Sequence, residues 1–352
     1  MRLKSSTGSF EPGAFRTTNA RRYGARSRLT TFDLAGIGLN ATDTLIKVAH
    51  FPAYGGKVPI EAEILSPGGQ VASALVAVAR LGKRVKYIGT VGDDERGRVQ
   101  LASLRETGIN LDDVQVRANC PNQMAYIVID ESTGERTVFW NRPECLRLQP
   151  AEIRPEMIAS ARMLHIDGHD TSAVEKGARI AREHGIPVSI DVDTIYPGFE
   201  RVLPLVDYLI ASSEFPGRWT KESDPCRALE LIQNEYRMRV AAMTLGAHGA
   251  LARVAPNAVS GADSEFIYSP GFVVDCVDTT GAGDVFHGAF CYSVLEGWGV
   301  RETLEFANAM AALNCTKLGA RGGIATLDEI REVMAHAPRR SHAEFAAHVK
   351  RA

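Results

Sequence analysis

The sequence predicts a three-layer α/β/α core of the Rossmann-like kind, with a mostly parallel sheet between helices and a small β-sheet lid. β-prone and helix-length segments alternate along most of the 352 residues, and such alternation is typical of parallel sheets covered on both faces. Two β-rich stretches, about 45–65 and 123–141, interrupt the alternation without a helix between their strands. We therefore expect these two stretches to form the lid over a cleft.

The elements of the core follow from local patterns. Residues 71–81 are rich in alanine and valine and end at Gly82, which is typical of a helix closed by glycine. Asp224 and Pro225 predict a helix start, because aspartate caps free amides and proline fits the first helical position. We expect strands at 31–37, 85–88, 163–166, 188–190, 208–210 and 240–244, and helices at 71–81, 99–107, 172–184, 285–295 and from 225 onward.

The composition excludes several classes of protein. Hydrophobic residues make up 45% and charged residues 23% of the chain, which argues against a disordered or fibrous protein. Lysine and arginine number 40 against 42 acidic residues, so the formal net charge is −2. Neither this balance nor any apolar run indicates a nucleic-acid or membrane partner. We expect a soluble, cytoplasmic protein with one main domain at 31–340.

The two ends of the sequence differ from this domain. Residues 1–30 carry seven basic residues and a single acidic one, Glu11, with no apolar run typical of a secretory signal. We expect a basic, disordered extension or an extended start site, with an organelle transit peptide as the alternative. Residues 341–352 are expected to be a C-terminal tail.

The six cysteines are widely spaced. No C-x-x-C pair occurs among them, and the histidines do not cluster. In a chain of this length, that spacing predicts buried thiols in a reducing compartment, and neither disulfides nor a zinc site. The prediction applies to Cys120, Cys145, Cys226, Cys276, Cys291 and Cys315.

The most informative segment is a run of small residues that leads into a helix-length apolar stretch. It reads Asp278-Thr279-Thr280-Gly281-Ala282-Gly283-Asp284-Val285-Phe286. Small residues let the backbone approach a ligand closely, and the first N–H groups of a helix have no intrahelical partner. These donors and the positive end of the helix dipole favour a phosphate-like anion. An acidic residue in the first turn, here Asp284, either stabilises the helix start or takes part in chemistry.

The segment resembles the signature of the ribokinase-like (PfkB) carbohydrate kinases, D-T-x-G-A-G-D-x-F, at every specified position. A second family motif is similar to Gly68-Gly69 at a helix start, followed by Tyr87-Ile88-Gly89 and Val91-Gly92-Asp93-Asp94. The resemblance covers residues 31–335, with some similarity to ketose kinases such as ketohexokinase. It implies a ribokinase-like fold and a transfer of the γ-phosphate of ATP to a sugar hydroxyl.

The resemblance also implies the catalytic and substrate-binding residues. A sugar hydroxyl is a poor nucleophile, so a carboxylate must take its proton as it attacks the phosphate. Asp284 matches the family's general base, and the amides of Gly281, Ala282 and Gly283 match its anion hole. Many relatives carry asparagine where this chain has Gln70 or Ser73, so the sugar stays open. The implied substrate-binding residues are Asp43, Gly69, Gln70, Ser73, Arg136 and Asp167.

Similarities on the nucleotide side are shorter. Residues 244–249 match a T-x-G-x-x-G segment near the ATP phosphates, and Asn308 matches a position near adenine. Ser213 lies where relatives begin an N-x-x-E motif, which this chain lacks because Ser213 and Pro216 replace its two specified residues. The implied ATP-binding residues are Ser213, Thr244, Gly246, Gly249 and Asn308.

Two metal ions are implied. Glu214 follows Ser213 and is the expected carboxylate for Mg²⁺, through water, since Mg²⁺ keeps much of its hydration shell. Asp278, Thr280 and Gly319 match a pair of loops that hold K⁺ in potassium-activated members of the family.

Several alternatives stay open at this stage. Gly36 to Ala41 spells a G-x-G-x-x-A dinucleotide fingerprint, which would require a helix where the chain has β-prone residues and Pro52. A nucleoside kinase of the same fold is a further possibility, because Phe139 and Trp140 could enlarge an aromatic pocket. A catalytically silent sugar- or nucleotide-binding regulator is another. We also expect a homodimer, because lid sheets of this family often pair their edges.

Overall fold

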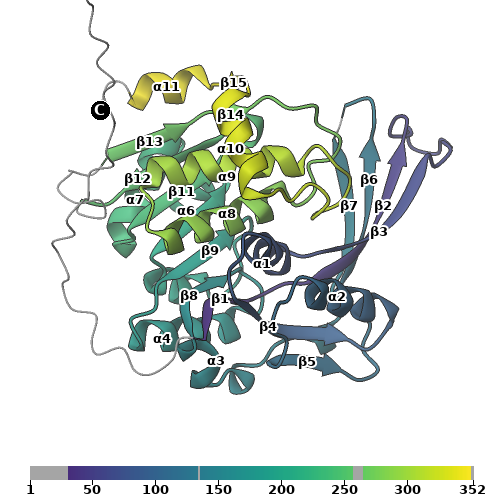
Figure 1. The fold of residues 1–352 in the computed structure, drawn as a ribbon, viewed down its shortest axis with the longest axis horizontal. Coiled ribbons are helices and arrows are strands. Elements are labelled where there is room, and N and C mark those ends of the chain that lie inside the picture. Colours follow the sequence, from purple (N-terminus) through teal and green to yellow (C-terminus); the bar gives the residue numbers. More distant parts are fainter. Residues whose placement is uncertain (1–30, 134, 257–264, 350–352) are drawn as a thin grey trace, which may run out of the picture.

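The described part of the chain folds around one large twisted sheet with helices on both of its faces (Figure 1). A computed structural model describes residues 31–133, 135–256 and 265–349; the predicted basic extension at 1–30 lies outside them. The nine strands run in the order β13-β12-β11-β10-β9-β8-β1-β4-β5. Their bounds are β1 (Phe32–Ile37), β4 (Val85–Gly92), β5 (Val114–Arg117), β8 (Ala161–Ile166), β9 (Val188–Val192), β10 (Tyr208–Ser212), β11 (Val240–Thr244), β12 (Ala250–Val254) and β13 (Glu265–Ser269).

The predicted α/β/α arrangement is confirmed. All neighbouring strands of the main sheet are parallel except for β12 and β13, which run antiparallel at one edge. One apolar core lies under α1, α8, α9 and α10, and the other under α3, α4, α6 and α7. The helices are α1 (Gln70–Arg80), α2 (Glu95–Glu106), α3 (Pro155–Ala159), α4 (Thr171–Glu183), α5 (Phe199–Val202), α6 (Phe215–Thr220), α7 (Pro225–Tyr236), α8 (Ala282–Glu296), α9 (Val300–Asn314), α10 (Leu327–His336) and α11 (Ala343–Val349).

A second sheet, called the lid sheet below, projects from the carboxyl edge of the core (Figure 1). It consists of β3 (Ala62–Gly68), β2 (Ala41–Val48), β6 (Met124–Asp130) and β7 (Arg136–Asn141), paired in that order. Strand β2 follows β1 after three residues, so no helix follows the glycines of the dinucleotide fingerprint. A small apolar cluster of Leu45, Ala125, Ile127 and Ile129 packs one face of this sheet against Leu318.

The C-terminal part differs from the tail that the sequence suggested. Strands β14 (Gly271–Phe272) and β15 (Arg339–Arg340) pair, and α11 follows. Phe345 of α11 is buried in the core, and the backbone N–H of His342 donates to the Tyr268 hydroxyl at 2.6 Å. None of the helices that the structure describes is both long and apolar enough to cross a membrane.

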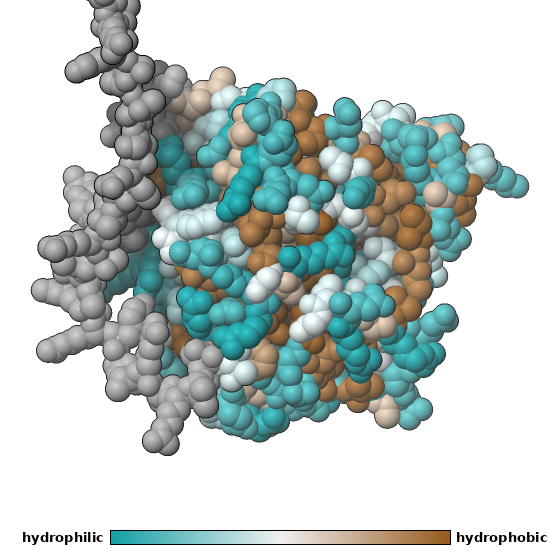
Figure 2. Space-filling model, in the orientation of Figure 1, coloured by the Kyte–Doolittle hydropathy of each residue, from teal (hydrophilic) through white to brown (hydrophobic). Residues whose placement is uncertain are grey.

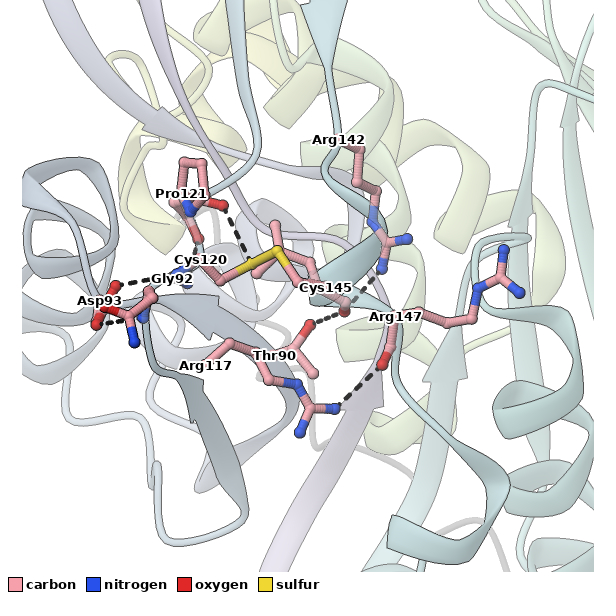
Figure 3. The surroundings of a disulfide bond; sticks show 12 residues. Thr90, Gly92, Asp93, Arg117, Cys120, Pro121, Arg142, Cys145 and Arg147 are labelled. Carbon is pink, nitrogen blue, oxygen red and sulfur yellow. Dashed lines mark hydrogen bonds between the residues drawn. A yellow bond between two sulfur atoms is a disulfide. The ribbon is translucent and has the colours of Figure 1, made fainter.

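The prediction of buried thiols was wrong for three cysteines. Cys120, before β6, and Cys145, in the short helix η1 (Glu144–Leu146), form a disulfide with Cα atoms 6.0 Å apart (Figure 3). Cys276 is exposed and Cys315 is a half-buried thiol, whereas Cys226 and Cys291 are buried thiols as predicted. The pairing is hidden in the sequence because 25 positions separate the two sulfurs. The hairpin β6–β7 lies between them and returns the chain to its starting point.

The disulfide joins the two ends of that hairpin to each other, and hydrogen bonds attach the first of them to the end of β4. The Asp93 carboxylate accepts from the backbone N–H groups of Asn119 and Cys120 at 2.8 and 3.3 Å (Figure 3). The N–H of Gly92 donates to Asn122 Oδ1 at 3.0 Å. The base of the hairpin is therefore fixed to the core by hydrogen bonds as well as by the sulfur bridge.

We expect that removal of the disulfide destabilises the protein. A loop of this length restricts the unfolded chain, so a Cys120→Ser/Cys145→Ser double variant should lose about 3–4 kcal/mol of unfolding free energy. Chemical unfolding with and without a phosphine reductant measures the difference, with Cys226→Ser as the control that stays sensitive to reductant. Titration of the denatured, unreduced protein should give the four free thiols of the structure. A titre of six would contradict the bridge.

Candidate active site

The start of α8 is shaped to receive an anion. Gly281 caps the helix with φ +72°, and a Cβ atom there would lie 2.3 Å from the Ala320 carbonyl oxygen. Only glycine fits this left-handed and crowded position without strain. A Cβ atom on Gly283, in contrast, would meet nothing within 4 Å. The backbone is therefore tightly held on one side and open on the other.

The amides of this turn are largely free. In the described parts of the chain, the N–H groups of Gly281 and Gly283 have no hydrogen-bond acceptor, and that of Ala282 makes only a 3.3 Å bond to Thr279. Free N–H groups at a helix start attract negative charge. The predicted anion hole is thus geometrically available, since one long hydrogen bond is the only competing contact.

Asp284 projects from the first turn of α8 and is partly buried. Burial, followed by the nearby charge of Asp191, raises the pKa of Asp284 to about 7, against the opposite effects of His287 and Arg321. Its carboxylate accepts no hydrogen bond from the residues that the structure describes. A carboxylate with a pKa near neutrality and a free lone pair is suited to accept a proton from a ligand.

Two neighbours of Asp284 were not predicted from the sequence. Asp191, at the carboxyl end of β9, lies 3.0 Å from His287 Nε2, and both side chains are buried. Burial opposes ionisation of Asp191, yet the His287 ring leaves the pKa of Asp191 below its usual value. Burial and the charge of Asp191 raise the pKa of Asp193. A strand end followed by D-x-D is the only sequence signal that could have indicated these carboxylates.

Asp43 faces the site from the lid sheet. It lies in β2, is 8% exposed, and accepts from the N–H of Ala125 at 2.9 Å. Burial raises the pKa of Asp43 to about 6, while the Ala125 amide, Arg96 and Arg321 oppose the rise. A Cβ atom on Gly68 would lie 3.0 Å from Asp43 Oδ2. The second oxygen of Asp43 therefore points to the glycine loop before α1.

The predicted residues of this loop divide into two kinds. Gly69 has φ +95° and packs closely on Asn40, so that a Cβ atom on Gly69 would lie 2.4 Å from the Asn40 Cα. The next residue, Gln70, begins α1. Ser73 is completely buried, and its hydroxyl accepts from Nε of Arg321 at 3.1 Å. Gly69 and Gln70 thus border the site, whereas Ser73 supports an arginine that was not predicted to act.

Arg136 connects the lid sheet to the turn from Asp278 to Gly283 before α8, which is called the anion turn below. Its guanidinium donates to the Thr279 hydroxyl, two residues before Gly281. A cavity of about 890 Å³ lies between the tip of the hairpin β6–β7 and the turn before α8. It is lined by Lys47, Glu131, Ser132, Thr133, Glu135, Arg136, Val138, Cys276, Val277 and Thr279.

Asp167 serves the backbone. It is fully buried, and its carboxylate accepts from the N–H groups of Leu39 at 2.6 Å and His169 at 2.9 Å. Burial raises the pKa of Asp167 well above its usual value. Both oxygens are engaged, so Asp167 holds the loop between β1 and β2, which leads to Asp43.

The predicted nucleotide-binding residues are of two kinds, some at the end of β11 and in the turn after it, and one buried in α9. Thr244 ends β11, and the turn from Gly246 to Gly249 leads into β12. Gly249 has φ +94°, and a Cβ atom there would lie 2.0 Å from the Ser269 carbonyl oxygen. Asn308 is buried in α9, and its amide nitrogen donates to the carbonyl and hydroxyl oxygens of Ser269 at 3.0 Å. Asn308 therefore supports this turn through Ser269, on which Gly249 packs.

Glu214, the carboxylate predicted for Mg²⁺, fits this ion only if a bound ligand supplies further oxygens. Ser213 and Glu214 are exposed after β10, and the Glu214 side chain has no hydrogen-bond partner within the described ranges. Those ranges contain no group of three or more metal-ligating side chains that could hold an ion alone. Mg²⁺ commonly uses one or two carboxylates with phosphate oxygens and water. Glu214 suits that role at the same edge of the sheet.

Asp278 joins the anion turn to the loop after α9. Its carboxylate is buried and accepts from the N–H groups of Thr280 and Gly319, both at 2.8 Å. The Thr280 hydroxyl is buried without a hydrogen-bond partner in the described chain. Asn314 donates to the carbonyls of Thr280 and Ala320 at 3.2 Å. Oxygens gathered in this way fit a weakly hydrated cation such as K⁺.

Curated relatives cover most of the chain. It is 29% identical to an ATP-dependent ribose-1-phosphate kinase of Halopiger xanaduensis, over 79% of this chain and 90% of that protein. It is 28% identical to a ribokinase of Bacillus subtilis, over 76% of this chain and 87% of that protein.

Solved structures and a family model agree with these relatives. A putative ribokinase from Agrobacterium tumefaciens has a TM-score of 0.79 and 29% identity, over 86% of this chain and 97% of that one. An E. coli putative Ribokinase II in complex with ATP and Mg²⁺ has a TM-score of 0.73 and 23% identity, over 86% and 99%. The model of the pfkB family carbohydrate kinases matches residues 35–327. The chain therefore belongs to the pfkB family of carbohydrate kinases.

Proposed function

We propose that this kinase transfers the γ-phosphate of ATP to a sugar hydroxyl, with Asp284 as the general base. The observation that carries the proposal is the juxtaposition of Asp284, with its pKa raised to about 7, and the free amides of Gly281 and Gly283. One group removes a proton, and the others receive the charge of the phosphoryl group. Asp43 faces this place from the lid sheet as an acceptor of sugar hydrogen bonds.

In the proposed step the alcohol oxygen attacks the γ-phosphorus while Asp284 takes its proton. A bond forms between that oxygen and phosphorus, the bond to the bridging β–γ oxygen breaks, and ADP leaves. The amides of the anion turn stabilise the charge that the equatorial oxygens carry. The chemistry is positioning and charge stabilisation, which agrees with a site made of backbone donors and one unpartnered carboxylate.

Two cations complete the proposal. Mg²⁺ would neutralise the phosphates of bound ATP, with Glu214 as the carboxylate that holds its water. The ATP-dependent relative and the neighbour solved with ATP and Mg²⁺ support this pairing. The buried Thr280 hydroxyl without a hydrogen-bond partner in the described chain and the carbonyls near Asp278 support a K⁺ site beside the anion turn.

The lid sheet would exclude water from the reaction. Arg136 bonds to Thr279 and brings the hairpin β6–β7 against the anion turn. Exclusion matters because water competes with the sugar for the phosphoryl group and weakens every charge interaction in the site.

A nucleoside acceptor is the second candidate, and one residue favours it. Trp140 is 67% exposed and pairs across the lid sheet with Ala125, which contacts Asp43. Its ring therefore lies on the same face of the lid sheet as Asp43 and could stack on a base. A silent regulator is the third candidate, because the Ser213 to Pro216 segment lacks the residues of N-x-x-E.

The acceptor is tested by product identification. Purified protein is incubated with MgATP and D-ribose, D-fructose, ribose 1-phosphate or adenosine, and the products are identified by phosphorus NMR. We expect a phosphorylated sugar and ADP in equal amounts. Phosphorylation of adenosine alone would favour the nucleoside kinase, and ATP hydrolysis that no acceptor stimulates would favour the silent binder.

Asp284→Asn is expected to separate catalysis from folding. Loss of the proton acceptor should lower kcat by about 10²–10⁴-fold. The melting temperature should stay equal or rise, because the variant removes a desolvated charge. Steady-state kinetics and thermal unfolding measure the two effects, with Asp112→Asn on the surface as control. Wild-type turnover in Asp284→Asn would remove this residue as the base.

The pH dependence of kcat/KM should reflect the two site carboxylates. Asp284 must be ionised to accept a proton, and its raised pKa of about 7 means that protonation begins near neutrality. We expect activity to fall as pH drops below 7 and to fall more steeply below about 6, where Asp43 also gains a proton. A profile flat from pH 8 to pH 5 would contradict the assignment.

A homodimer through the lid sheet is part of the proposal. Leu65, Tyr126 and Phe139 are exposed and in cross-strand register with Thr44, so they lie on the face opposite to Asp43. Figure 2 shows apolar surface over the region of the lid sheet, at the right of the view. Sedimentation velocity at micromolar concentration should give a particle of twice the chain mass, and Phe139→Asp should give a monomer. A wild-type monomer would refute the dimer.

A further inference from the structure

A buried arginine lies in the loop between α9 and α10. Arg321 is 6% exposed, and its backbone is held on both sides. Asn314 donates to the Ala320 carbonyl and accepts from the Gly323 N–H, each at 3.2 Å, while Asp278 binds Gly319. The backbone on both sides of Arg321 is therefore held by Asn314 and Asp278, the same side chains that bind Thr280 in the turn before α8.

The guanidinium of Arg321 joins three elements, namely α1, α2 and the end of β3. It donates to the Ser73 hydroxyl of α1 at 3.1 Å, to the Ser103 hydroxyl of α2 at 3.0 Å and to the Gly68 carbonyl of β3 at 2.7 Å. In the orientation that satisfies both ends of its amide, Gln100 also accepts from Arg321 at 3.0 Å. All of these acceptors are neutral oxygens.

The charge of Arg321 has no direct partner. In the described ranges, no carboxylate lies within salt-bridge distance of its guanidinium. Burial lowers the pKa of Arg321 to about 10, and the charges of Asp284 and Asp43 oppose this change. A buried cation without a contact ion pair is unfavourable for folding. None of the four neutral acceptors requires a positive charge, so the charge of Arg321 needs an explanation other than these hydrogen bonds.

The two carboxylates that respond to Arg321 are those that face the acceptor. Asp43 approaches from the lid sheet and Asp284 from α8, and Arg321 opposes the rise of the pKa at both. Ala320, the preceding residue, touches both loops: a Cβ atom on Gly68 would lie 3.4 Å from its Cβ, and one on Gly281 would lie 2.3 Å from its oxygen. Arg321 is therefore at the junction of the glycine loop Gly68–Gly69, called the acceptor loop below, and the anion turn.

We propose that Arg321 is a positioning residue for the phosphoryl transfer, which holds the chain from Gly68 to Ser73 at a fixed place beside the turn before α8. The inference rests on the proposed function. Hydrogen bonds fix where the sugar lies relative to the base, because Gly68 and Gly69 form the loop that borders Asp43. The positive charge of Arg321 also opposes the rise of the pKa of both carboxylates, and so favours their ionised forms.

Two variants separate the two effects. Arg321→Lys keeps the charge and loses the planar fork, and Arg321→Gln loses the charge and keeps part of the hydrogen bonding. Arg80→Met is the matched control, because Arg80 donates to the carbonyls of Arg321 and Ile324 in the same loop at 3.5 and 3.4 Å. The charged groups that face Asp284 are Asp191, Asp193, His287 and Arg321.

The assay measures kcat and KM for D-ribose and D-fructose and for MgATP, the pH profile of kcat/KM, and the melting temperature. For Arg321→Gln we expect the acidic side of the kcat/KM profile, called the acid limb, to move up by about one pH unit or more. The reason is that the carboxylates lose a nearby positive charge. For both variants the KM for the sugar should rise about tenfold or more through lost charge-assisted hydrogen bonds, and the KM for ATP should stay within about twofold. Arg321→Lys should keep the wild-type acid limb.

The outcomes distinguish this proposal from a purely structural role. Equal increases in both KM values, or the same changes in Arg80→Met, would overturn it, as would an unmoved acid limb and sugar KM in Arg321→Gln. If Arg321→Gln does not fold, Arg321→Lys decides: a raised sugar KM with the wild-type acid limb supports the proposal, and a wild-type KM overturns it. Failure of the proposed function is separate, because it would appear as full activity in Asp284→Asn.

Discussion

The arrangement of the site depends on the buried carboxylate of Asp278. Its two oxygens accept from Thr280 and Gly319, which lie in loops 39 positions apart and on opposite sides of α8 and α9 in the sequence. The first loop sets the direction of the free amides and of Asp284, and the second carries Arg321. If these loops were held separately, the anion turn and the acceptor loop could not keep a fixed distance. Asp278, together with Asn314, therefore couples the turn before α8 to the loop that carries Arg321.

Desolvation is the second constraint, and it acts on three charges together. Asp43 and Asp284 would be ordinary carboxylates in water, and burial raises the pKa of each. The same burial lowers the pKa of Arg321. The charge of Arg321 therefore favours ionisation of both carboxylates, and they in turn favour its protonated form, although none of the three forms an ion pair with another residue that the structure describes. A site built in this way costs stability and gains reactivity, because its charges are available to a ligand.

The sequence predicts what is encoded locally. The turn from Asp278 to Asp284 was identifiable because its glycines, its helix start and its carboxylate lie within a few positions. Arg321 lies in a loop that also resembles the family, yet its role depends on Ser73, which is 248 positions away. The Asp191–His287 contact and the Cys120–Cys145 bridge are hidden for the same reason. Asn308 was matched by position alone, and its amide faces Ser269.

Asp43 and Asp284, the proposed sugar contact and the proposed base, come from two different parts of the fold. Asp284 belongs to a core helix, whereas Asp43 belongs to β2, a strand of the lid sheet that continues from β1 after three residues. Asp167 holds that short connection through Leu39, and Arg96 binds the Thr42 carbonyl at 2.7 Å. The lid sheet is therefore attached firmly to the core next to Asp43, the proposed sugar contact, and the hairpin tip near Arg136 lies far along the strands. Asp43 is thus held beside Gly68 at the attached end of the lid sheet, whereas Arg136 lies at the far end beside the cavity, so the proposed acceptor contact and the proposed water exclusion belong to different ends of one sheet.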